Sequence, residues 1–159
     1  MTNDMITEDY VSFETAKLLK EKGFDEPCYQ CYVLIDKFVE TSYYEFAVNS
    51  KLIKFERLYA DEQPLINSKG FRDFINNKDK SRVFAAPTLQ MAMKWLREVH
   101  HLFIQIEYEC EDCFVSDIYS MTDYDEWGGH KHYPPTFVNC KTYEQACETA
   151  VKHCLEKLI

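Results

Sequence analysis

Two cysteine pairs in the 159-residue chain have the spacing of metal or redox sites. Cys28 and Cys31 lie in EPCYQC, and Cys110 and Cys113 lie in EYECEDCF. Four thiolates suit a tetrahedral zinc ion, which tolerates a long separation between its ligand pairs. Compact zinc turns often have glycine after the second cysteine, whereas aromatic residues follow here. We therefore favour unrelated, partly buried thiols and keep a zinc-binding protein as an alternative.

A redox pair is the second chemistry that the C-x-x-C spacing supports. Thioredoxin-like pairs follow a strand and open a helix, whose N-terminus lowers the thiol pKa. Cys28 instead leads into a predicted strand, while Cys110 and Cys113 flank the predicted hairpin turn of Glu111 and Asp112. Because neighbouring carboxylates disfavour thiolates, we do not expect thioredoxin-like catalysis.

Negative charge is concentrated in residues 107–126. The chain has a formal net charge of −9, and this region has no Lys or Arg. Its acidic residues are Glu107, Glu109, Glu111, Asp112, Asp117, Asp123, Asp125 and Glu126. Phosphate backbones are bound by positive charge, so we expect no direct nucleic-acid binding. The region indicates a solvated acidic face; the functional alternatives are a cation site and a surface for a basic protein partner.

The stretch DYDEWGGHKHYPP, residues 123–135, has the composition of a surface loop, and partner binding by this loop is a functional alternative. Two glycines loosen it, two prolines follow it, and its two histidines can share a face only if the chain is extended. A metal or catalytic site in this loop is an alternative. The candidate partner-binding residues are Glu107, Glu109, Glu111, Asp112, Asp117, Trp127, His130, His132 and Tyr133.

Recognised catalytic motifs are absent from the sequence. It has no G-x-S-x-G, no phosphate-binding glycine-rich loop, no H-E-x-x-H and no dinucleotide fingerprint. We therefore predict a non-catalytic protein-interaction or accessory module without a cofactor. A small enzyme with an unrecognised site is the remaining alternative.

The first half of the chain predicts a helix followed by strands. Residues 11–24 read as a helix with Ser12 as N-cap and Gly23 as its left-handed stop. Residues 28–38 and 42–55 are rich in the aromatic and branched residues of strands. Residues 59–86 predict an irregular connection, with one short helix around residues 70–75.

The second half predicts the order α-β-β-β-α. A helix begins near Pro87, with its apolar stripe at Leu89, Ala92, Met93, Leu96 and Val99. Strands follow at 102–108, 113–121 and 136–139. The last helix begins with a Thr142–Gln145 capping box, and its apolar stripe includes Tyr143, Cys147, Cys154 and Leu158.

These elements define an α+β protein with an antiparallel sheet and helices packed on one face. We predict one compact domain, 1–159, with substructure at 1–58, 59–86 and 87–159. No stretch approaches the roughly 20 apolar residues of a membrane span, and MTNDMITEDY does not have a signal peptide's basic n-region. We therefore expect a cytoplasmic protein, in a compartment where thiols stay reduced. An odd total of seven cysteines also does not fit a full disulfide framework.

Three stretches carry a resemblance: YVSFETAKLLKEKGFDEPC, AAPTLQMAMKWLREVHHLFI and YEQACETAVKHCLEKLI. They resemble a group of small uncharacterised proteins of gut-bacterial genomes and prophages. The resemblance implies a bacterial or phage-borne cytosolic protein. It supplies no catalytic residues, because the group has no established activity, and it leaves homo-oligomerisation open.

Overall fold

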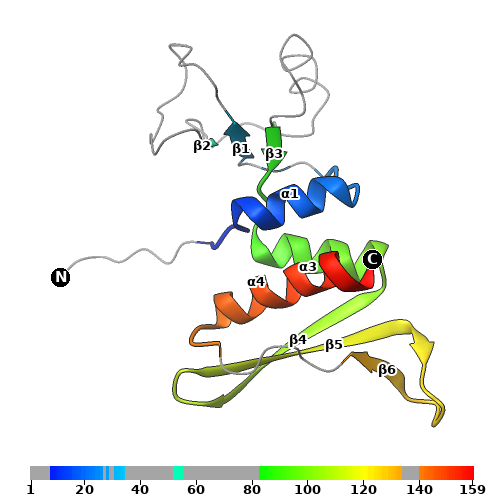
Figure 1. Cartoon of the computed structure of the whole chain (residues 1–159). Helices are drawn as coiled ribbons and strands as arrows, with labels where there is room; N and C mark the ends of the chain where they lie inside the picture. The colour runs from blue at the N-terminus through cyan, green and yellow to red at the C-terminus, as the bar shows by residue number, and fades with distance from the viewer. Residues whose placement is uncertain (1–7, 27, 29–30, 35–51, 56–82, 134–139) are drawn as a thin grey trace, which may run out of the picture. The chain divides into compact units, whose positions relative to one another are not determined.

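The computed structural model describes residues 8–26, 28, 31–34, 52–55, 83–133 and 140–159. The chain divides into two compact units, one made of Met1–Val11 with Thr88–Ile159 and the other of Ser12–Pro87. The elements, labelled in Figure 1, are α1 (Phe13–Glu21), β1 (Cys31–Leu34), β2 (Leu52–Phe55), β3 (Val83–Ala85), α3 (Leu89–Val99), β4 (Leu102–Cys110), β5 (Cys113–Tyr124), β6 (His130–Tyr133), α4 (Tyr143–His153) and the π-helical turn η2 (Cys154–Leu158).

The unit Ser12–Pro87 combines α1 with an antiparallel sheet of order β2-β1-β3. Ser12 caps α1, because its hydroxyl oxygen accepts a hydrogen bond from the Thr15 amide at 3.3 Å. Gly23 follows the helix at φ +87°, a conformation that glycine adopts without steric cost. The predicted helix and both of its end signals are therefore confirmed.

Aromatic side chains join α1 to its sheet. The Phe13 ring meets the rings of Tyr32 and Phe84 edge-on, with centroids 5.7 and 5.3 Å away. Tyr32 lies opposite Phe84 in the register of β1 and β3, so one ring from the helix contacts two neighbouring strands. Such edge-to-face pairs add to the stabilisation that the buried area itself provides.

Residues 83–85 correct the prediction of an irregular connection over 59–86. They form β3, which pairs antiparallel with β1, because a short Val-Phe run gains backbone partners there that local turn signals do not reveal. The predicted strands at 28–38 and 42–55 are represented by β1 and β2. The helix expected around residues 70–75 lies outside the described residues.

In the other unit, α3 begins at a threonine cap rather than at Pro87. The Thr88 hydroxyl oxygen accepts from the Met91 amide at 3.2 Å. The segment that precedes α1 is bonded to the start of α3. Tyr10 forms an antiparallel bridge with Thr88, and the Leu89 amide donates to the Asp9 carbonyl at 2.9 Å. The segment before α1 and the start of α3 are thus neighbours in space.

The buried stripe of α3 differs from the prediction at its C-terminal end. Leu89, Ala92 and Leu96 are buried as expected, but Val99 is 53% exposed and Trp95 is buried in its place. The stripe rotates toward Trp95 because a large aromatic ring covers more of the core than the isopropyl group in the last turn. His101 then takes φ 56° and connects the helix directly to β4.

The second sheet is antiparallel, with the order β4-β5-β6. Leu102 lies opposite Ser120 and Ile104 opposite Ile118, and these side chains are buried on the face that α3 and α4 cover (Figure 1). The α+β class, the α-β-β-β-α order and the placement of helices on one face of an antiparallel sheet are confirmed.

The last helix has the predicted cap in a modified form. The Thr142 hydroxyl oxygen accepts from the Gln145 amide at 3.1 Å. Gln145 returns a bond from its side-chain oxygen, but it accepts from the Lys141 amide, one residue before the usual partner. Buried residues continue through the helix into η2, where Cys154 and Leu155 are fully buried. Among the described residues, no helix is long and apolar enough to cross a membrane.

Removing the Thr142 hydroxyl should destabilise this unit measurably. We expect Thr142→Ala to lower the free energy of unfolding by about 1 kcal/mol, because the Gln145 amide loses its partner. Thr142→Ser keeps the acceptor and should recover most of that loss. Urea unfolding followed by circular dichroism measures both variants. Equal destabilisation by serine and alanine would show that the cap contributes nothing.

Candidate partner-binding surface

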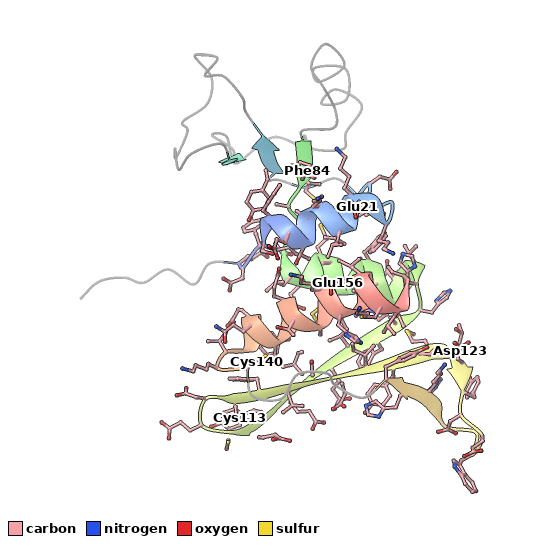
Figure 2. The ribbon with its side chains drawn as sticks, in the orientation of Figure 1. Glu21, Phe84, Cys113, Asp123, Cys140 and Glu156 are labelled. Carbon is pink, nitrogen blue, oxygen red and sulfur yellow. The ribbon has the colours of Figure 1, made fainter. Side chains whose placement is uncertain are left out.

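The acidic region predicted as one surface is divided between the two ends of β5. Glu107 and Glu109 lie on β4 at one end, with Asp112 in the turn that follows, and Trp127 lies in the turn at the other end. Figure 2 shows Cys113 and Asp123 near these opposite ends of the sheet. The 12 residues of β5, at about 3.3 Å per residue, span roughly 40 Å. The two groups therefore do not adjoin each other on the sheet.

The β4–β5 turn brings one of the cysteine pairs together. Cys110 and Cys113 are direct partners across the hairpin, and Asp112 between them takes φ 54°. Cys110 is exposed, whereas Cys113 is buried, with its thiol 3.8 Å from a carboxylate oxygen of Glu109. Burial raises the pKa of Cys113, and Cys110 and the Glu109 charge raise it further.

The other cysteine pair belongs to the unit Ser12–Pro87. Cys28 is buried, and its thiol donates to the Glu26 carbonyl at 3.3 Å. Burial, with a smaller contribution from the Glu26 charge, raises the pKa of Cys28 to about 12. Within the described parts of the chain, no three His, Cys, Asp or Glu side chains form a group that could hold a metal ion. Zinc binding stays an untested alternative.

Residues 123–133 correct the prediction of a surface loop, because most of them belong to a β-hairpin. β5 continues to Tyr124, and β6 begins at His130, its partner in the register. Their rings stack with centroids 4.9 Å apart, and Tyr119 and His132 stack at 4.8 Å. Cross-strand ring pairs of this kind stabilise a hairpin that polar composition alone does not indicate. The strand predicted at 136–139 lies outside the described residues.

His130 and His132 share a face because β6 is extended, as expected for residues two apart in a strand. His132 Nε2 lies 2.8 Å from a carboxylate oxygen of Asp117. Tyr133 lies opposite Ile118 and faces the helix-covered side of the sheet. The structure thus groups Asp117 with His132 on the open face and separates Tyr133 from them.

Trp127 stands at the tip of the β5–β6 hairpin and is 88% exposed. One carboxylate oxygen of Asp125 accepts from the amides of both Trp127 and Gly129, each at 2.9 Å. The Asp125 amide donates to the Gly129 carbonyl at 2.8 Å, and Gly128 takes φ +80°. Residues 125–129 are therefore held in an ordered turn that presents the indole ring to solvent.

A hollow of about 380 Å³ opens on the sheet face opposite the helices. Its lining residues are Phe103, Gln105, Tyr119, Ser120, Met121 and His130. Phe103 is 39% exposed and Met121 44% exposed, so the floor is apolar and open to solvent. Neither was a predicted site residue, although strand alternation places Phe103 on the face opposite Leu102 and Ile104.

Comparison of the chain with protein-family models, curated proteins and solved structures finds no significant match.

Proposed function

We propose that the protein is a non-catalytic cytoplasmic interaction module of bacterial or phage-borne origin. Its β5–β6 hairpin and the adjoining open sheet face would bind a basic protein partner. One observation carries this proposal: Trp127 is 88% exposed on a turn that several hydrogen bonds hold in place. Exposing an indole to water costs free energy that a binding partner recovers when it covers the ring.

The ordered turn matters because binding normally includes the cost of immobilising side chains and loops. Asp125 has already organised the backbone around Trp127, so less ordering remains when a partner docks. Tryptophan is also among the residues that contribute most binding energy at interfaces. An exposed tryptophan on an ordered backbone turn is therefore well suited to be the central contact.

Further apolar groups extend this contact along the sheet. Tyr124 is 62% exposed, and Met121 and Phe103 are exposed at the hollow. Together with Trp127 they are four of the large hydrophobic side chains that the described residues leave exposed. Exposed apolar groups that cluster and are bordered by polar residues mark interaction sites more often than single ones do.

Charge indicates the chemistry of the partner. Residues 121–133 contain three carboxylates, Asp123, Asp125 and Glu126, and one cationic side chain, Lys131. Lys131 lies over the Tyr133 ring, 5.2 Å from its centroid. A complementary partner has an apolar pocket for the indole, bordered by Lys or Arg side chains, and salt should slow its association.

A random peptide library displayed on phage tests the proposal without knowledge of the partner. Selection on the purified protein should enrich peptides that combine Lys or Arg with apolar residues. Trp127→Ala should weaken the binding of the enriched peptides at least about tenfold, the loss of a binding hot spot. Tyr108→Ala is the matched control, since Tyr108 is 66% exposed at the opposite hairpin, and it should leave binding unchanged. Failure to enrich, or peptides that bind Trp127→Ala equally well, would overturn the proposal.

A further inference from the structure

The tip of the β4–β5 hairpin holds two thiols directly opposite each other. Cys110 pairs with Cys113 in the antiparallel register, after an irregularity between Tyr108 and Cys110. Opposed residues of antiparallel strands have Cα atoms about 4.5–5.5 Å apart, and disulfides join Cα atoms about 4.4–6.8 Å apart. The hairpin backbone therefore has the spacing that a Cys110–Cys113 disulfide requires.

The two thiols differ in access to solvent. Cys110 is exposed, whereas Cys113 is only 8% exposed, with its thiol near the Glu109 carboxylate. A reagent from solution therefore reaches Cys110 first. Cys113, held beside it by the hairpin register, is placed to attack the Cys110 sulfur in a second step.

We propose that Cys110 and Cys113 form a dithiol modification site that exchanges with small-molecule disulfides and prefers cationic ones. In the first step, the Cys110 thiolate attacks one sulfur of the reagent, whose S–S bond breaks and releases one thiolate. In the second step, the Cys113 thiolate attacks the Cys110 sulfur and expels the other half of the reagent. The protein is oxidised to a disulfide, the reagent is reduced to two thiols, and the two cysteine protons end on those thiols.

The negative charge around Cys110 and Cys113 accounts for the preference for cationic disulfides. Glu109, Glu111 and Asp112 are all exposed and lie beside or between the two cysteines. Their carboxylates repel an anionic disulfide and attract a cationic one, an effect that salt screens. Burial, Cys110 and the Glu109 charge also raise the pKa of Cys113, so the second step should become faster as pH rises.

Two reagents of opposite charge test the site on the reduced full-length chain. Cystamine is cationic and 3,3′-dithiodipropionate is anionic, and both are used at the same concentration near pH 8. Mass spectrometry should show the loss of two hydrogen atoms and, after digestion, a peptide in which Cys110 and Cys113 are linked. Oxidation should be several-fold faster with cystamine at low salt, and high salt should bring the two rates together.

Single substitutions separate the two steps. Cys113→Ser should stop at a mixed disulfide on Cys110, and Cys110→Ser should react as slowly as the fully buried Cys147 and Cys154. The double variant Glu109→Gln/Glu111→Gln should form the same product with a smaller preference for cystamine. A mixed disulfide that persists in the unaltered protein, a disulfide between two chains, or equal rates with both reagents would overturn the proposal.

Discussion

Replacing Leu96 with alanine should lower the free energy of unfolding by about 2–5 kcal/mol, as expected for a fully buried leucine. Leu96 is 0% exposed in the middle of α3, next to the buried Trp95 and one turn after the fully buried Ala92. Truncation removes apolar area from the core and leaves a space that packed neighbours fill only in part. The loss is a large fraction of the stability of a small protein, which is about 5–15 kcal/mol.

Val99→Ala in the same helix is the matched control. Val99 is 53% exposed, so its truncation should cost less than about 1 kcal/mol. Urea denaturation, followed by the fluorescence of Trp95 in a Trp127→Phe background, reports the unit that contains α3. If the two alanine variants unfold at the same urea concentration, Leu96 does not belong to the core of that unit.

Alkaline pH should destabilise the protein through its buried thiols. Burial raises the pKa of Cys28 and of Cys154 to about 12 and that of Cys147 to about 11, from an ordinary value of 9.0. In the unfolded chain these thiols ionise near 9, whereas in the folded protein they stay protonated until pH 11–12. Between these values the folded state binds more protons than the unfolded state. Stability is therefore unaffected below pH 9 and falls above it, by about 1.4 kcal/mol per pH unit for each thiol.

Cys154→Ala isolates the contribution of one thiol. The variant should be less stable than the unaltered protein at neutral pH, because a buried sulfur atom is lost. Its stability should nevertheless fall less steeply between pH 9 and 12, since one titrating group is gone. Urea unfolding at several pH values gives both slopes, and the contributions of lysine and tyrosine cancel in the comparison. Identical slopes would contradict the assignment of a raised pKa to Cys154.

Structural features that depend only on residues close together in the sequence could be predicted from it. Ser12 and Thr142 are caps because a side-chain oxygen reaches an amide three residues later, and Gly23 ends α1 because it accepts a positive φ. The two helices and the first two strands of the α-β-β-β-α order followed from the same local patterns, whereas β6 lies where a loop was predicted. In contrast, the burial of Trp95 rather than Val99 depends on which elements pack against α3. The spacing of apolar residues in the sequence does not reveal those elements.

Predictions about the candidate site failed where they depended on how long a strand is and on which strands pair. Acidic residues that are close in sequence from 107 to 126 are separated because β5 is 12 residues long and places most of them near one or the other of its ends. The β5–β6 hairpin was missed because it depends on the stacking of Tyr124 on His130 and of Tyr119 on His132, which becomes visible only once the register is known. The ordered turn at Asp125 could have been found, since aspartate side chains often accept from the amide two residues on and two glycines follow close behind.

The bridge between Tyr10 and Thr88 has a consequence for how the chain can vary. The whole segment Ser12–Pro87 leaves the other unit and returns to it at two residues that are already paired. A segment attached at adjacent points behaves as an insertion, since changes in its length do not alter the ends that it must join. The length of the chain between Val11 and Thr88 can therefore change without altering the Tyr10–Thr88 bridge beside which its two ends lie.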